Sequence, residues 1–123
     1  MEKIKKYAEL FGLNGLLGVD LSNEKPGFLP TKEWKEETVR ERWYVGDTYH
    51  LAIGQGDLRV TPLQVASYTS VFANGGTLYR PSLISRYLDQ ENKQEVLPKP
   101  EIIRSDFISE KSLNIVRQGL RQA

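Results

Sequence analysis

The chain has 123 residues, and its 17 Lys and Arg against 16 Asp and Glu give a formal net charge of +1. Hydrophobic residues make up 39% and charged residues 27%, proportions typical of a soluble globular protein. So balanced a charge argues against a nucleic-acid surface or a polybasic membrane segment. The lack of cysteine excludes disulfides, thiolate nucleophiles and zinc-finger ligands.

No part of the sequence predicts a membrane span or an export signal. No apolar run approaches the ~20 residues that a spanning helix requires. The charged residues 1–6 are not followed by an apolar stretch, so they do not form a signal peptide. Export information, if the protein has any, is expected in a longer parent protein.

The first half of the chain is expected to consist of helices separated by loops. Residues 2–11 carry one helical stripe, made of Ile4, Tyr7, Ala8 and Phe11. Gly12 then occupies the position of a helix C-terminal glycine. The glycine- and proline-containing residues 14–30 predict a loop with at most one short strand. Residues 31–38 predict a short helix with a threonine N-cap, and residues 43–56 an irregular to short-helical segment packed against a core.

The strongest local pattern is the run Thr61-Pro62-Leu63-Gln64, a capping box with proline at the first helical position. It predicts a helix that runs to Asn74 and stops at Gly75-Gly76. This helix has no charged residue, and little of its circumference is polar. We therefore expect it to be buried on most sides.

The last third predicts a β-hairpin followed by a helix. The strands are expected at about 77–88 and 94–98, with the turn in residues 89–93. The helix begins near Ser109 and has an apolar line of Leu113, Val116 and Leu120. Because no cap or glycine precedes the end at Ala123, the chain is expected to be cut from a longer one.

Two short matches to serine acyl-transfer motifs occur, and we interpret both as accidental. Residues 22–25 read S-x-x-K, but Pro26 disfavours the helical geometry that would bring Lys25 to the Ser22 hydroxyl. Residues 112–114 read S-x-N inside an amphipathic surface helix. Neither K-[ST]-G nor G-x-S-x-G is present.

Other kinds of site find equally little support. His50, the only histidine, lacks neighbours that would orient a triad and is expected to be packed or half-exposed. One histidine without cysteine disfavours a transition-metal site. Four carboxylates suit hard cations but lack EF-hand spacing: Asp20, Glu24, Asp47 and Asp57.

Glycine and aromatic patterns are interpreted structurally. Gly54-Gln55-Gly56 fails the dinucleotide fingerprint, because Arg59 stands where a third glycine is required. Its glycines instead suit positive φ or close backbone approach. Trp34, Trp43 and Tyr44 suit either a sugar-stacking platform or a packed loop. The residues alone thus indicate a soluble α+β piece without a self-contained active site.

Three blocks of this sequence resemble class B penicillin-binding proteins. The first runs from Tyr7 to Leu13 and continues with Gly18-Val19-Asp20-Leu21, Glu24 and Pro30. The second holds Gly46-Asp47-Thr48, Ala52–Gly56 and Val60–Ala66, and the third is Ala73–Pro81. The spacing A-I-G-Q-G, T-P-L-Q-x-A, A-N-G-G carries most of the resemblance, and G-D-x-x-x-x-A-I-G-Q-G resembles elongation-type members. Residues 14–17 and 22–23 depart from the family pattern.

The resemblance implies an α+β fold: a mostly helical segment with a β-hairpin, within a transpeptidase domain of the serine β-lactamase-like kind. It further implies a parent enzyme, a serine-type D,D-transpeptidase that binds β-lactams and cross-links peptidoglycan stem peptides through an acyl-enzyme. Such a parent is anchored in the bacterial inner membrane, faces the periplasm and acts in cell-wall and cell-shape formation. No cofactor, metal or nucleic acid is implied.

The resemblance also places the chain within its parent. Residues 1–123 would form a partial transpeptidase domain between the S-x-N and K-T-G motifs, with no catalytic residue of its own. We expect this piece to be inactive, to act as scaffolding and to self-associate through exposed apolar surface. Two alternatives remain open: a free-standing, non-catalytic binding module, and a fragment of a penicillin-sensing receptor or β-lactamase relative.

Overall fold

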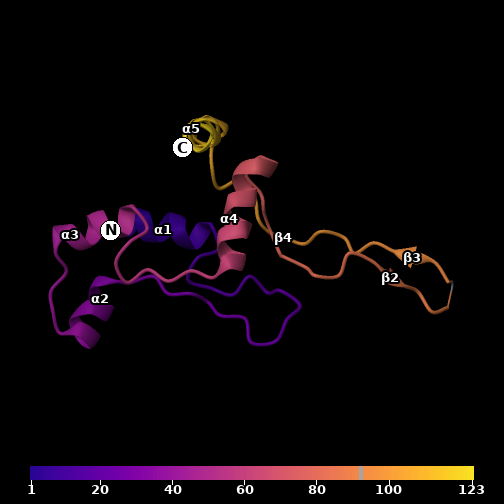
Figure 1. Ribbon diagram of the computed structural model, residues 1–123, viewed down its shortest axis with the longest axis horizontal. Helices are drawn as coiled ribbons and strands as arrows, with labels where there is room; N and C mark the ends of the chain where they lie inside the picture. Colours follow the sequence, from indigo (N-terminus) through magenta and orange to yellow (C-terminus); the bar gives the residue numbers. More distant parts are fainter. Residues whose placement is uncertain (92) are drawn as a thin grey trace.

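The computed structural model describes residues 1–91 and 93–123 and has the α+β fold expected (Figure 1). The helices are α1 (Glu2–Leu10), α2 (Lys32–Trp34), the π-helical turn η1 (Lys35–Val39), α3 (Val45–Ala52), α4 (Pro62–Asn74) and α5 (Glu110–Gln122). The strands are β1 (Leu78–Tyr79), β2 (Tyr87–Leu88), β3 (Glu95–Val96) and β4 (Ile102–Arg104). No helix in the described ranges is long and apolar enough to cross a membrane.

The first helix, α1, confirms the helix predicted over residues 2–11. Phe11 is its C-cap, and Gly12 follows with φ +85°. The Phe11 ring stacks on Phe72 of α4 with centroids 5.1 Å apart, and it meets Phe107 edge-on, also at 5.1 Å. Aromatic pairs of this kind contribute about 0.5–1.5 kcal/mol beyond area burial. The last turn of α1 is therefore attached to α4.

Residues 31–52 form the compact end opposite the hairpin (Figure 1). Thr31 caps α2 as predicted, because its Oγ1 accepts a hydrogen bond of 3.1 Å from the Trp34 amide. The chain continues as η1 and leaves it at Arg40 with φ +61°. The segment expected to be irregular to short-helical contains α3, whose Leu51 side chain is buried.

Helix α4 begins and ends where the sequence predicts, but its predicted burial is wrong for this chain. The capping box is complete, and Gly75 ends the helix with φ +94°. Only Gln64, Ser67 and Val71 are buried, at spacings that place them on one face. Val65, on another face, is exposed. The absence of charge makes a helix compatible with burial, but the packing of other segments against it decides which of its faces are buried.

The hairpin is confirmed at β2 and β3 and projects far from the body (Figure 1). The two strands pair antiparallel, with Tyr87 opposite Val96. Within the predicted turn, the Lys93 amide donates to the Asp89 carbonyl at 2.9 Å; Asn92 lies outside the described residues.

The prediction that residues 77–88 form one strand is wrong. Their first part, β1, pairs antiparallel with β4, a strand that the sequence does not predict, and Leu78 lies opposite Arg104. Pro81 follows β1 and has no N–H for a ladder, which favours a break at this point. Two separate two-stranded sheets result.

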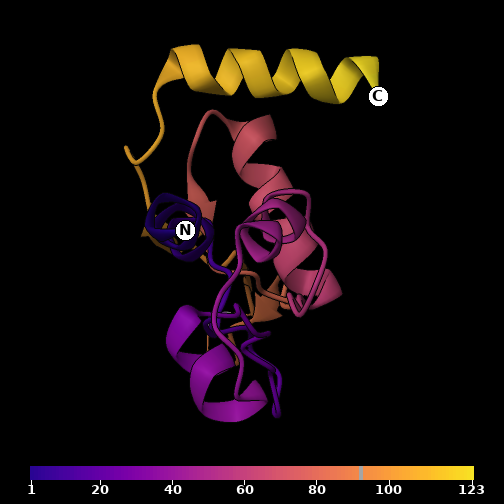
Figure 2. The ribbon, with the colours of Figure 1, turned by 90° about the vertical axis from the view of Figure 1, so that its left-hand side faces the viewer.

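Helix α5 begins at the predicted Ser109 cap and lies across one end of α4 (Figure 2). Of its predicted apolar line only Leu113 is buried, while Leu120 is exposed. The Arg117 guanidinium donates to the carbonyls of Phe72 and, at 3.3 Å, Ala73. These carbonyls lie in the last turn of α4, where helical partners are missing.

The buried apolar side chains come from the loop after α1 and from α3, α4, β1 and α5: Leu17, Val19, Leu29, Leu51, Val71, Leu78 and Leu113. The loop over residues 14–30 therefore supplies part of the core although it has no regular secondary structure.

Candidate functional site

The first serine motif match lies in a turn rather than on a helix. Asn23 between its serine and lysine has φ +65°. Ser22 and Lys25 are both exposed, and no hydrogen bond described in the structure joins the hydroxyl to the amine. This geometry is that of the solvated loop expected from the sequence.

The second match is engaged in capping α5. The Ser112 amide donates to Ser109 Oγ at 3.2 Å, and the two hydroxyl oxygens are 2.9 Å apart. Leu113, the middle residue of the match, is one of the buried core side chains. The arrangement stabilises a helix start and presents no activated nucleophile.

His50 is exposed on α3, so the expectation of a packed or half-exposed side chain is wrong. The neighbouring Leu51 is the residue of α3 that faces the core. Successive helical residues are rotated by about 100°, which turns His50 outward.

The four candidate carboxylates are dispersed rather than gathered. Glu24 accepts from the Leu17 and Gly18 amides at 2.7 and 2.9 Å, while Asp57 is exposed. Within the described ranges no three His, Cys, Asp or Glu side chains are placed to share a metal ion.

Lys35 and Asp47 form a half-enclosed ion pair between η1 and α3. Lys35 Nζ lies 2.7 Å from Asp47 Oδ2 and 3.7 Å from Glu41 Oε2, and the Tyr44 amide also donates to Asp47 at 2.7 Å. The hydrogen bond from Lys35 is the main cause that lowers the pKa of Asp47, and the same bond raises the pKa of Lys35. A small cavity of about 30 Å³ beside the pair is also lined by His50.

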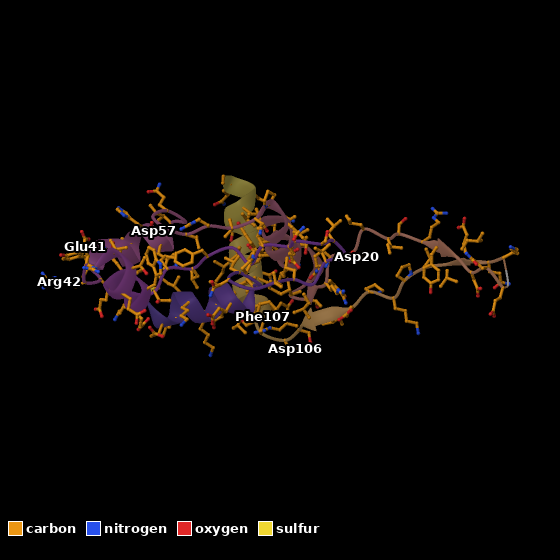
Figure 3. All side chains as sticks on the ribbon, turned by 90° about the horizontal axis from the view of Figure 1, so that it is seen from below. Asp20, Glu41, Arg42, Asp57, Asp106 and Phe107 are labelled. Carbon is orange, nitrogen blue, oxygen red and sulfur yellow. The ribbon has the colours of Figure 1, made fainter. Side chains whose placement is uncertain are left out.

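The three aromatic residues considered for sugar stacking do not form one platform. The Trp34 ring packs edge-on against Phe28 with centroids 4.8 Å apart. Trp43 Nε1 donates to Thr48 Oγ1 at 2.8 Å. The Tyr44 ring has the Lys35 amine 5.0 Å and the Arg42 guanidinium 5.1 Å from its centroid. Figure 3 places Arg42 and Glu41 at the end of the molecule opposite the hairpin.

The best-built polar cluster is the Gln64 junction, defined here as the Gln64 side chain and the four backbone groups that it binds. Gln64 is 1% exposed. Its Oε1 accepts from the Thr61 amide at 3.0 Å, as the capping box predicts. Its Nε2 lies 3.3, 3.0 and 2.8 Å from the carbonyl oxygens of Gly12, Gly15 and Pro26. The sequence predicts only the bond to Thr61, since no local pattern indicates partners so distant in the chain.

A second set of contacts fixes the base of the hairpin. Asp20 accepts from Ser82 Oγ at 3.0 Å and from the Leu83 amide at 3.1 Å, and the latter bond is the main cause that lowers its pKa. Arg80 donates to the Gly18 carbonyl and pairs with Glu101 at 2.8 Å. Figure 3 shows Asp20 where the projecting hairpin meets the body.

These clusters hold segments together, and none has the geometry of acyl-transfer chemistry. Activation of a serine nucleophile requires a neighbouring base such as lysine or histidine. No hydrogen bond described for the chain joins a serine hydroxyl to either residue type. What the geometry supports is the joining of residues 12–26 to the start of α4, and of residues 18–20 to the base of the hairpin.

Residues 1–123 match the family model described as the penicillin binding protein transpeptidase domain. The chain is 33% identical over 84 residues to the peptidoglycan D,D-transpeptidase MrdA of Escherichia coli K12, covering 68% of this chain and 13% of that protein. It is also 33% identical over 119 residues to stage V sporulation protein D of Bacillus subtilis 168, covering 97% of this chain and 17% of that protein. The chain thus spans under a fifth of either relative.

Solved structures show the same fold. Penicillin-binding protein PBP2 of Helicobacter pylori, in a complex with MreC, is 36% identical with a TM-score of 0.72, over 96% of this chain and 20% of that chain. PBP2 of Pseudomonas aeruginosa, in complex with WCK 5153, is 29% identical with a TM-score of 0.74, over 98% of this chain and 27% of that chain.

Proposed function

Because the chain belongs to the penicillin-binding protein transpeptidase family, as a class B member of the elongation type, we propose that it is part of a peptidoglycan D,D-transpeptidase. The whole protein would cross-link stem peptides through a serine acyl-enzyme and would bind β-lactams at that serine. It would be anchored in the inner membrane with this segment on the periplasmic side. The identity to the MrdA transpeptidase supports this activity.

Within that enzyme we propose a scaffolding role for residues 1–123, in the interval between the S-x-N and K-T-G motifs. The observation that carries this role is the Gln64 junction, where one buried amide binds three carbonyls from the loop after α1. Buried polar networks that are fully satisfied make a fold rigid and specific. Both serine motif matches are engaged in a turn or a helix cap, which agrees with chemistry located elsewhere in the parent.

Labelling with a fluorescent penicillin tests the division between scaffold and chemistry. The 123-residue chain is expected to form no covalent adduct, and a longer protein that includes the flanking motifs is expected to be labelled. A Ser22→Ala variant of the short chain is the matched control. A label on the short chain that this variant abolishes would show that the chain has its own nucleophile and would contradict the proposal.

A second test asks whether the parent covers α4. Ala66 and Ala73 are exposed in this chain, so Ala66→Leu is expected to change its free energy of unfolding by less than ~0.5 kcal/mol. In the longer protein the same change should overpack a buried site and cost about 1–3 kcal/mol. Thermal unfolding of both proteins measures the difference. Equal, small effects in the two would argue against α4 as an internal support, whatever the penicillin labelling shows.

A further inference from the structure

A groove beside the start of α4 adjoins the Gln64 junction, with which it shares Pro26 and Thr61. It has a volume of about 290 Å³ and is formed by two segments, Lys25–Phe28 and Arg59–Thr61; we call it the Phe28 groove. An antiparallel bridge joins the segments: the Phe28 amide donates to the Arg59 carbonyl at 2.7 Å, and the Arg59 amide donates to the Phe28 carbonyl at 2.9 Å. The groove is therefore a feature of the folded backbone.

The wall of the groove is apolar and held in place. Phe28 is packed edge-on against Trp34, with centroids 4.8 Å apart. The Arg59 guanidinium lies 5.2 Å from the Phe28 ring centroid, and Val60 beside it is 38% exposed. An apolar side chain that enters the groove would thus meet an ordered aromatic surface.

The backbone of the groove is equally constrained. Gly27 has φ +70°, and a Cβ there would lie 2.7 Å from both the Arg59 carbonyl oxygen and Gln64 Oε1. The Pro26 carbonyl is bound by the Gln64 amide. A site whose backbone is fixed before binding loses little conformational entropy when a ligand enters. The Gln64 junction therefore pre-forms the groove.

The charges around the groove have one sign. Of the residues that line it, Lys25 and Arg59 are charged and both are cations. The adjacent Glu24 directs its two carboxylate oxygens to backbone amides of residues 17 and 18. Asp57 lines a separate cavity with His50. An apolar wall flanked by two exposed cations is complementary to an apolar side chain flanked by carboxylates.

We propose that the Phe28 groove binds an extended acidic peptide segment of a partner protein, with one apolar side chain against Phe28 and carboxylates on Lys25 and Arg59. Its volume is at the lower end for ligand pockets and suits one side chain rather than a large ligand. Two cations form no stripe that would follow a nucleic-acid backbone, and they fall short of the clusters that bind acidic membranes. The proposal does not depend on the transpeptidase activity.

Titration of the isotope-labelled 123-residue chain with acetyl-Glu-Leu-Glu-amide tests the proposal by NMR. Saturable shifts are expected at the amides of Gly27, Phe28 and Val60. The isosteric peptide acetyl-Gln-Leu-Gln-amide should bind at least tenfold more weakly, and added salt should weaken only the acidic peptide. Equal affinity for the two peptides, or shifts confined to other residues, would refute the charge-complementary groove.

Charge-reversal variants test whether Lys25 and Arg59 are the cations that bind the peptide. Lys25→Glu and Arg59→Glu are each expected to weaken the acidic peptide at least tenfold, whereas Lys99→Glu, at another exposed lysine, should leave binding unchanged. Unchanged amide shifts in α4 and α5 would show that the variants remain folded; Lys25→Gln and Arg59→Gln, which remove the charge without reversing it, provide milder changes if they do not. Peptide-free shifts at the groove that grow with protein concentration would make a second copy the occupant. Binding to phosphatidylglycerol vesicles but not to the peptide would make it a membrane. Either result overturns the proposal.

Discussion

The centre of the molecule, around Gln64 and Val71, and its hairpin arm, residues 85–98, are stabilised by contacts of different range. At the centre, the Gln64 amide binds carbonyls 52, 49 and 38 residues away in the sequence. In the arm, Arg86 pairs with Glu95 only nine residues away. Val71 at the centre is 0% exposed, but Tyr87 in the arm is 54% exposed. Long-range contacts and burial occur together at the centre. Substitutions there should therefore lower the free energy of unfolding far more than substitutions in the arm.

The largest effect is expected for Gln64→Leu. The substitution keeps the side-chain size but removes the donor for three carbonyls and the acceptor for the Thr61 amide. A fully buried group left without a partner costs about 1–3 kcal/mol, and these groups are only partly buried, so the summed cost is smaller than four such losses. We expect a loss of about 3 kcal/mol in the free energy of unfolding, measured by urea denaturation.

Gln94→Leu in the arm is the matched control. Its side chain is exposed, so the expected change is below ~0.5 kcal/mol. Similar losses for Gln64→Leu and Gln94→Leu would remove the distinction between centre and arm, and with it the scaffolding role given to the junction.

The sequence predicts the contacts of this centre that join neighbouring residues, and it does not predict those that join distant segments. The box from Thr61 to Gln64 and the stop at Gly75 depend on neighbours within a few residues, and both are confirmed. The further bonds of Gln64 depend on how residues 12–26 return to α4, which no local pattern encodes. The prediction that α4 is buried on most sides is wrong for the same reason. Hydrophobic composition does not show which face of a helix another element will cover.

The strands show the same limit at a smaller scale. The β2–β3 hairpin joins segments that are close in the sequence, so alternation and turn residues suffice to predict it. The pairing of β1 with β4 closes a longer loop, and β4 has only the residues Ile102–Arg104. Three residues are too few to show a period of two. The same holds for the candidate site. The motif matches that the sequence offers are local, whereas the contacts that build the Gln64 junction join residues far apart in the chain.

A moderate effect is expected for Arg117→Ala, which tests how α5 is attached to the centre. The Arg117 guanidinium donates to the carbonyls of Phe72 and Ala73 at the end of α4. Hydrogen bonds from charged groups contribute about 1.5–3 kcal/mol, and partial exposure places this one at the lower end. We expect a loss of about 1–2 kcal/mol and faster hydrogen exchange in α5. Arg121→Ala on the same helix, at an exposed position, should change neither; equal exchange in both variants would show that Arg117 does not hold the helix.

The ion pair of Lys35 and Asp47, at the end of the molecule opposite the arm, predicts that the free energy of unfolding depends on pH. The pKa of Asp47 is lowered from its ordinary 3.8, chiefly by the hydrogen bond from Lys35. The ionised carboxylate therefore stabilises the fold fully above 3.8, and this stabilisation is lost as the pH falls through the lower, folded-state value. Asp47→Asn should be less stable than the native chain at neutral pH, and the difference should shrink below pH 3.8. Asp57→Asn, at an exposed carboxylate, is the control; a constant difference for Asp47→Asn down to the lowest pH would contradict the coupling.

The smallest effect is expected for Arg86→Ala, which breaks the ion pair of the arm. Arg86 and Glu95 lie 2.8 Å apart, but their side chains are 63% and 62% exposed. Exposed pairs contribute about 0.2–1 kcal/mol and are screened by salt. We expect a change below ~0.5 kcal/mol in the free energy of unfolding, which disappears at high salt. Isolated two-stranded hairpins are at best marginally stable in water, so faster hydrogen exchange confined to β2 and β3 should accompany it. A loss as large as that of Arg117→Ala would mean that the arm is coupled to the centre through the contacts of Asp20 and Arg80.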